Sequence, residues 1–188
     1  MLAPDFPLRT ERLLLRPVDA ETDPDAMAAY QSRADVCRYV PYEPRGRDRI
    51  AEVIREQRRT ALTEAGQHLW LAVLLGDTGR LIGDVLLFWR SEQHRSGEIG
   101  YAFNPDDHGH GYATEAAAAL LDLGFDGLGL HRIIGCIDAR NEASAQVLRR
   151  LGMRQEAHLV QNEWFKGEWS DEIDFAILAD EWRALRQR

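Results

Sequence analysis

The sequence predicts an α/β protein in which helices cover a mixed β-sheet, and three observations support that prediction. Stretches with the two-residue period of strands alternate along the chain with stretches that have the spacing of amphipathic helices. The expected order is β-α-α-β-β-β-α-β-α-β-β, which gives a mixed sheet with helices packed on it. The length of 188 residues suits one domain, and no linker rich in Pro, Gly or Ser divides the chain, so residues 1–188 are expected to form a single domain.

Strands are predicted where apolar side chains alternate with polar ones or run together over a few residues. Pro17 stops the first strand, and the turn Gly-Asp-Thr-Gly at residues 76–79 joins the second strand to the third as a hairpin. Lys166-Gly167 joins the last two strands. The predicted strands are residues 8–17, 68–75, 81–89, 96–104, 131–138, 154–160 and 171–178.

Helices are predicted where apolar residues recur every three or four positions between capping residues. Asp23 is expected to be the N-cap of the first helix, with Pro24 at its first position. Asn141 is expected to cap the fourth helix, and Gly152 lies just past its end. The predicted helices are residues 23–33, 48–63, 113–128 and 142–151, with a short fifth helix from about residue 180.

Charge and hydropathy argue against several kinds of partner. The chain has 23 Lys and Arg against 31 Asp and Glu, a net charge of −8, which argues against nucleic acid or an anionic membrane. The longest apolar runs are far shorter than the ~20 residues of a membrane-spanning helix, and the N-terminus lacks the apolar core of a signal peptide. Cys37 and Cys136 lie far apart without metal-binding spacing, which is typical of a reducing compartment. We therefore expect a cytoplasmic protein.

The most informative segment runs from Asn104 to Ala116, between a predicted strand and a predicted helix. Gly109 and Gly111 allow the backbone to turn tightly and to approach a ligand. The helix that follows offers unpaired N–H groups and a partial positive charge, and Thr114 adds a hydroxyl. These features suit a phosphate or pyrophosphate; the alternative is an ordinary loop before a helix. The segment is not a P-loop, because no Gly-Lys-Ser/Thr follows.

A metal site is the other function that this segment suggests. His108 and His110 stand beside Asp106 and Asp107, and imidazoles and carboxylates are zinc ligands. However, no second cluster of such residues is evident in the sequence, and the glycines serve backbone contacts better than metal ligation. We therefore expect no metal.

Four short motifs together resemble the GNAT acetyltransferases. They are Glu-Ile-Gly-Tyr at residues 98–101, His-Gly-His-Gly-Tyr-Ala-Thr-Glu-Ala at 108–116, Asn-Glu-Ala-Ser at 141–144 and Leu-Gly-Met at 151–153. Within that family the chain is similar to the branch of RimJ/RimL-type ribosomal-protein N-terminal acetyltransferases, which its opening residues 8–16 and its closing residues 167–182 also fit. The resemblance spans nearly the whole chain. It implies the GNAT fold with a splayed central sheet, and acetyl-CoA as co-substrate.

The resemblance also implies which residues bind acetyl-CoA. The pyrophosphate is expected on backbone amides of the glycine-rich turn, and the pantetheine arm beside the strand at residues 96–104, as if it were another strand. The family prefers Gln, Arg or Lys where His108 and His110 stand, so CoA affinity is expected to weaken as the pH rises from about 6 to 8. The expected contacts are His108, Gly109, His110, Gly111, Tyr112, Ala113, Thr114, Asn141, Ser144 and the backbone N–H groups of Ala102 and Phe103 at the thioester carbonyl.

Glu98 and Ser144 are the expected catalytic residues. A carboxylate at Glu98 suits a general base for a protonated amine, and a structural ion pair is the alternative interpretation. Ser144 is expected to place a hydroxyl near the thioester sulfur. Many GNAT enzymes have a Tyr four residues after this Ser, as the acid for the leaving thiolate, but this chain has Leu148 there.

The acetyl acceptor implied by the resemblance is an amine. The candidate acceptor-binding residues are Tyr39, Trp164 and Trp169, which alternatively pack the last hairpin or a dimer face. We therefore expect an acetyl-CoA-dependent N-acetyltransferase that acts on a protein N-terminus or a small-molecule amine, as a monomer or homodimer. The alternatives are a non-catalytic CoA-binding regulator on the same fold and an antibiotic-modifying acetyltransferase.

Overall fold

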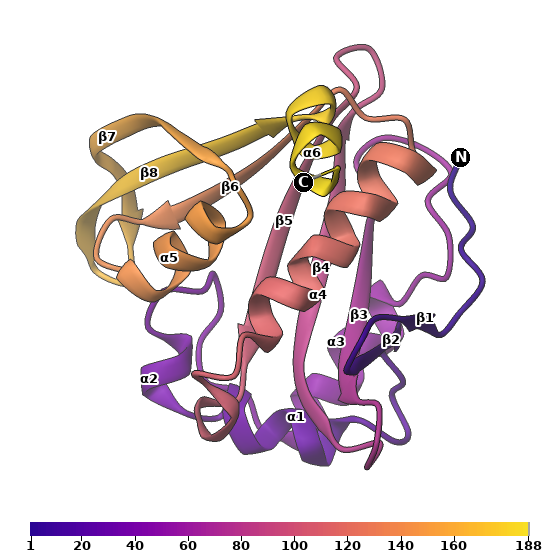
Figure 1. Ribbon diagram of the computed structural model, residues 1–188. Coiled ribbons are helices and arrows are strands. Elements are labelled where there is room, and N and C mark those ends of the chain that lie inside the picture. Colours follow the sequence, from indigo (N-terminus) through magenta and orange to yellow (C-terminus); the bar gives the residue numbers. More distant parts are fainter. Residues whose placement is uncertain (188) are drawn as a thin grey trace.

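An eight-stranded mixed sheet, in the order β1-β2-β3-β4-β5-β6-β8-β7, organises the described part of the chain. The computed structural model describes residues 1–187 (Figure 1). Neighbouring strands are antiparallel except β5 and β6, which run parallel. The strands are β1 (Leu8–Arg9), β2 (Leu13–Pro17), β3 (His68–Leu75), β4 (Leu81–Ser91), β5 (Ser96–Phe103), β6 (Arg132–Asp138), β7 (Arg154–Phe165) and β8 (Glu168–Leu178).

Helices cover both faces of this sheet, and each face has its own apolar core (Figure 1). Leu120, Leu121 and Phe125 belong to the core under α4, whereas Ile50 and Ile54 of α3 belong to the core on the other face. The helices are α1 (Pro24–Gln31), α2 (Ala34–Cys37), α3 (Arg47–Gln57), α4 (Tyr112–Asp122), α5 (Glu142–Arg150) and α6 (Ala179–Arg186), with a 3₁₀ turn η1 (Pro105–Asp107) and a π-helical turn η2 (Leu123–Gly127). This arrangement confirms the predicted mixed α/β fold.

The centre of the sheet is splayed between β5 and β6. The two strands pair only where Ser96–Glu98 lie beside Arg132–Ile134. Beyond Glu98, the edge of β5 that faces β6 has no ladder partner in residues 1–187. Along β5 the side chains alternate between the faces, so that Ile99 and Phe103 enter the α4 core while Ala102 packs on the α1 and α3 side. Glu98 therefore lies on the α1 and α3 side.

Two predicted elements of the N-terminal half differ from those observed. Residues 8–17 form two short antiparallel strands rather than one, because Thr10 closes a turn on Leu13: the Leu13 amide donates to Thr10 Oγ1 over 3.0 Å. The helix predicted over residues 48–63 ends at Gln57, since Arg58 has an extended ψ of 127°. The chain beyond it pairs Leu62 with Leu2 instead.

Differences at the remaining elements have equally local causes. Asp23 does not cap α1 through its side chain, because its carboxylate is bound by Arg16 at 2.6 and 2.8 Å. Asn141 does cap α5, accepting from the Ser144 amide. The helix predicted over residues 113–128 changes to π geometry at Leu123, where the Leu128 amide donates to the Leu123 carbonyl. The last hairpin, β7 and β8, is longer than predicted, and α2 was not predicted.

None of the described helices is long and apolar enough to cross a membrane.

Candidate active site

A cavity of about 500 Å³ opens where β5 and β6 diverge. β4 and β5 form one wall and β6 forms another. The start of α5 and the loop between α2 and α3 complete the lining, with Asn141 and Ser144 from the helix and Tyr39 and Tyr42 from the loop. The cavity therefore adjoins the free edge of β5, where an extended ligand can hydrogen-bond as an added strand.

The glycine-rich turn leads directly into the N-terminus of α4. Gly109 and Gly111 have φ angles of 81° and 80°, a left-handed conformation that favours glycine. α4 begins at Tyr112, so the amides of its first turn have no partner within the helix. The hydroxyl of Thr114 is buried and has no hydrogen-bond partner among the described residues. An unpaired buried donor at a helix N-terminus fits an anionic ligand such as a pyrophosphate.

The two histidines of this turn contact backbone carbonyls of their own segment. His108 Nε2 lies 3.3 Å from the Phe103 oxygen, and His110 Nδ1 lies 3.3 Å from the Asp107 oxygen. The His110 ring also stacks on Tyr112, with ring centroids 5.4 Å apart. These contacts give both rings a role in shaping the turn, and they do not bring the histidines and Asp106 together as a metal-ligand set.

Glu115 fastens the turn to the N-terminal strands. Thr10 Oγ1 donates to its Oε1 over 2.6 Å, and Arg12 Nε donates to its Oε2 over 2.7 Å. Arg12 also donates to the His110 carbonyl over 3.0 Å, which links the turn to the same ion pair. Glu115 is therefore committed to structural contacts, as its place in the first turn of a helix suggests.

Glu98 combines an ion pair with access to the cavity. Arg90 Nη1 donates to Glu98 Oε2 over 3.0 Å, and the carboxylate side chain is 32% exposed. Burial raises the pKa of Glu98 above its ordinary value, nearby Arg90 lowers it in part, and Asp174 raises it. The ion pair is therefore present, and the carboxylate also lines the cavity, so the role of Glu98 as general base stays a prediction.

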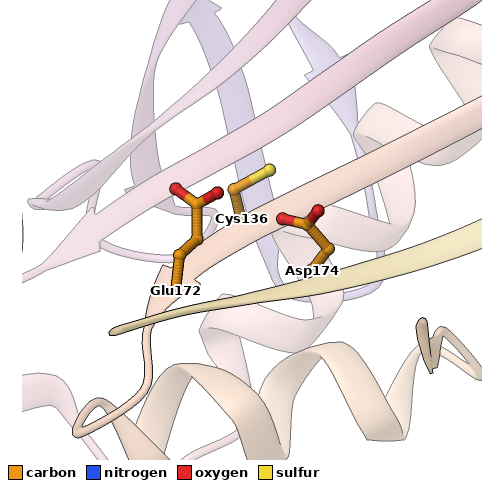
Figure 2. Close-up of side chains that lie close together, drawn as sticks. All are labelled: Cys136, Glu172 and Asp174. Atoms are coloured by element: carbon orange, nitrogen blue, oxygen red, sulfur yellow. The ribbon is translucent and has the colours of Figure 1, made fainter. Parts of the chain in front are cut away.

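A group of acidic side chains lies next to Glu98, on β6 and β8. Cys136 pairs with Asp174 in the ladder, and Figure 2 shows these two side chains close to that of Glu172. Their potential ligand atoms all lie within 4.8 Å of one another. Burial and the neighbouring carboxylates of Asp174 and Glu98 raise the pKa of the Cys136 thiol. The carboxylates of Glu172 and Asp174 thus lie close enough to Glu98 to raise its pKa or to have theirs raised by it, while Arg45 also lines the cavity.

The predicted thioester side of the site holds a contact that sequence reasoning missed. The side-chain Oδ1 of Asn141 accepts from the Ser144 amide over 3.1 Å, as a helix N-cap. The Ser144 hydroxyl lies 2.8 Å from the hydroxyl of Tyr101, which comes from β5. Leu148 is buried against β6, where a Cβ on Gly135 would lie 2.9 Å from it. No sequence signal pairs Tyr101 with Ser144, because 43 residues separate them.

The predicted acceptor-binding residues are not brought together. Tyr39 lines the cavity, whereas Trp164 and Trp169 do not. The two tryptophans are 63% and 56% exposed and form an edge-to-face pair at the end of the β7–β8 hairpin. Phe103 is likewise buried in the core rather than in the cavity lining.

The turn of that hairpin is fastened to the loop that lines the cavity. Lys166 Nζ donates to the carbonyl oxygens of Cys37 and Tyr42 over 2.6 and 2.8 Å, and lies 3.7 Å from Glu43. Lys166 is the only lysine in the sequence. Its compact ammonium can serve three oxygens in different directions, which the planar guanidinium of arginine does less well.

Comparison with known proteins identifies the family. Residues 12–154 match the family model described as acetyltransferase (GNAT) domain. The chain belongs to the GNAT acetyltransferase family. It is 34% identical over 175 residues to an uncharacterized N-acetyltransferase of Bacillus subtilis strain 168, covering 93% of this chain and 98% of the relative. It is 29% identical to spermidine N(1)-acetyltransferase of Escherichia coli K12 over 106 residues, 56% of this chain and 57% of the relative.

Solved structures of GNAT proteins have the same fold as this chain. An acetyltransferase of the GNAT family from Bacillus anthracis has a TM-score of 0.82 and 32% identity, covering 92% of this chain and 98% of that one. The spermidine N-acetyltransferase of Vibrio cholerae, in complex with CoA and spermine, has a TM-score of 0.78 and 23% identity, covering 93% and 99%. These findings confirm the resemblance to GNAT enzymes, and the protein is an acyltransferase of that family. The RimJ/RimL branch stays a prediction.

Proposed function

We propose that this GNAT protein transfers the acetyl group of acetyl-CoA to a primary amine bound in the cavity beside Glu98. The observation that carries the proposal is the position of one cavity between the free edge of β5 and a partly buried carboxylate. The turn at residues 108–114, with its unpaired Thr114 hydroxyl, lies immediately after β5 and suits the pyrophosphate.

In this proposal each part of the site has one task. Glu98 takes the proton that the amine must lose before its nitrogen attacks the thioester carbonyl. Because burial raises its pKa, Glu98 is a stronger base than an exposed carboxylate. The Phe103 N–H faces away from β4 and polarises the carbonyl, whereas the Ala102 N–H, also expected there, faces β4 in the ladder. Ser144 and Asn141 contact the pantetheine arm.

The acceptor class that we favour is a small cationic amine. The acidic group of Cys136, Glu172 and Asp174 lies beside Glu98, so a second ammonium on the same molecule would find opposite charge there. Relatives named as spermidine acetyltransferases, and the spermine in the Vibrio cholerae structure, support a polyamine-like acceptor. A protein N-terminus and an aminoglycoside-type antibiotic are the alternatives that an acceptor panel separates.

The test combines ligand-dependent unfolding with release of free thiol from acetyl-CoA. Acetyl-CoA at a hundredfold excess over its Kd should stabilise the protein by about 2.7 kcal/mol. Thiol release should then appear with a diamine or polyamine and be weaker with an N-terminal peptide. Stabilisation without turnover on any amine would instead support a CoA-binding regulator, and no stabilisation would contradict the proposed site.

Substituting a glycine of the turn tests the pyrophosphate site itself. Gly109→Ala should weaken acetyl-CoA binding about tenfold, because its φ of 81° is strained for alanine and a Cβ intrudes where the ligand approaches. Gly66→Ala is the matched control, since Gly66 has a φ of 92° and likewise has nothing within 4 Å of the added Cβ. Both variants should lose similar stability, and isothermal titration should show weaker acetyl-CoA binding only for Gly109→Ala. Equal affinities would place the pyrophosphate elsewhere.

Removing the Lys166 contact should affect the acceptor rather than acetyl-CoA. Lys166→Met releases the loop that carries Tyr39 and Tyr42, so the acceptor KM should rise about fivefold, equivalent to about 1 kcal/mol of loop ordering. Steady-state kinetics with each substrate varied in turn measures this change. Arg183→Met, which removes an exposed ion pair with Asp180 on α6, is the control. A change in the acetyl-CoA KM alone would contradict the assignment of this loop.

A further inference from the structure

Tyr101 and Ser144 form a pair of hydroxyl groups on the wall of the cavity. Tyr101 projects from β5 and Ser144 from the first turn of α5, and both residues line the cavity. Their hydroxyl oxygens are 2.8 Å apart, and the Tyr101 oxygen also lies 3.1 Å from the Ser144 carbonyl oxygen. The phenol therefore has two acceptors within reach on one residue.

These two acceptors allow two arrangements of the hydrogens. When Tyr101 donates to the Ser144 carbonyl, the Ser144 hydroxyl can donate back to the phenol oxygen. When Tyr101 donates to Ser144 Oγ, the hydrogen of Ser144 is free to point at a ligand in the cavity. Each hydroxyl has one hydrogen and two acceptor sites, so the second arrangement makes Ser144 an outward donor while its oxygen stays hydrogen-bonded.

Two features of the lining favour this pair as the source of a proton. Leu148 occupies the position where many GNAT enzymes have a tyrosine, and its side chain is apolar and buried. Burial raises the pKa of Tyr101 to about 12, so the phenol keeps its proton at neutral pH.

We propose that Tyr101 is a positioning residue that turns the Ser144 hydroxyl toward the departing thiolate and replaces the proton that Ser144 gives up. This inference rests on the proposed acetyl transfer. As the amine nitrogen bonds to the acetyl carbon, the carbon–sulfur bond breaks and its electron pair stays on sulfur. Sulfur takes the Ser144 proton and Ser144 takes the Tyr101 proton. Solvent then reprotonates Tyr101, while Glu98 releases the proton of the amine to solvent.

A double-mutant cycle with Y101F and S144A tests the pairing. Thiol release is measured with the best amine and also in slow hydrolysis of acetyl-CoA, which needs no amine. We expect S144A to lower kcat about a hundredfold, the lower end of the range for proton transfer by a side chain. Y101F should cost less, about tenfold, because the Ser144 hydroxyl remains. Because both substitutions break one relay, the double variant should be no slower than S144A. In Y101F the KM for acetyl-CoA should not change.

The control variant is W182F, which removes a comparable aromatic hydrogen bond far from the cavity. Trp182 Nε1 donates to Asp122 over 2.8 Å, between α6 and α4. W182F should lose stability in thermal unfolding without loss of kcat. A purely structural role for Tyr101 would make Y101F behave in the same way, and would overturn the inference.

A second measurement needs no variant. The relay moves two protons in one step, from Ser144 to sulfur and from Tyr101 to Ser144. When kcat is measured in mixtures of light and heavy water, we therefore expect it to depend on the deuterium fraction along a curve. A linear dependence, or losses from Y101F and S144A that multiply in the double variant, overturns the relay while the proposed function stands. If the unaltered protein releases no thiol with any amine or in hydrolysis, both the function and the relay are wrong.

Discussion

Glu98→Gln should lower kcat for amine acetylation about 100- to 10,000-fold, the range that general-base catalysis contributes. Glutamine preserves the size of the side chain and can still accept from Arg90, so the wall of the cavity is kept. It cannot accept the proton of an ammonium, and the acceptor must then lose that proton unaided. The Kd of acetyl-CoA should be unchanged, because the proposed pyrophosphate site lies in the turn after β5.

The pH dependence gives the same variant a second readout. The active form of Glu98 is the unprotonated one, so kcat/KM should rise with pH through the pKa of this group. Because burial raises that pKa, the rise should lie above the ~4.3 of an ordinary glutamate. Arg90→Gln removes a charge that lowers the pKa, so the rise should move to still higher pH. In Glu98→Gln this rise should be absent.

Glu156→Gln is the matched control for these measurements. Glu156 is paired with Arg132 and Arg154 and is not part of the cavity lining, so its loss should leave kcat and the pH profile intact. If Glu98→Gln instead turns over at the rate of the unaltered protein, the base is another group. Glu172 would then be the next candidate, because burial and Asp174 also raise its pKa.

Local sequence signals predicted most of the elements and the glycine-rich turn. The hairpin strand at residues 68–75 coincides with β3, and the Asn141 cap forms as expected, because apolar runs, turns and caps depend on neighbours in the chain. The same reasoning failed at residues 8–17, where the alternation of Leu13 and Leu15 with their neighbours predicted one strand but a turn closed by Thr10 divides it. Element boundaries of this kind depend on which strand lies alongside, which a local pattern does not contain.

The candidate site was harder to predict, because its contacts join distant segments. Tyr101 reads in the sequence as one more aromatic residue of a strand, and its bond to Ser144 exists only because α5 begins beside β5. Lys166 likewise donates to the carbonyls of Cys37 and Tyr42, more than 120 residues away in the sequence, because the fold places the last hairpin beside that loop. The sequence does contain one signal of a buried polar contact. Asp84 interrupts the apolar run of β4, and a carboxylate buried in such a run needs polar partners.

Those partners form a buried hydrogen-bond network beneath the cavity. Asp84 is 8% exposed and accepts from the Tyr30 hydroxyl at 2.5 Å, from Trp70 Nε1 at 2.8 Å and from Gln31 Nε2 at 3.1 Å. Tyr30 and Gln31 belong to α1, Trp70 to β3 and Asp84 to β4. A single carboxylate thus joins one helix to two strands on the α1 and α3 side of the sheet, and burial raises its pKa.

Asp84→Ala should therefore destabilise the fold by about 3–5 kcal/mol, because it leaves three buried donors without an acceptor. For a chain of this length, that loss lowers the Tm by about 6–20 °C in calorimetry. Asp107→Ala is the matched control: Asp107 is equally buried at 7%, but its partner Arg80 is half exposed and can turn to solvent. Asp84→Asn, which keeps one acceptor oxygen and the shape, should fall between them. If the two alanine variants lose the same stability, the network is no stronger than an exposed ion pair. Apolar packing alone would then hold α1 against β3 and β4.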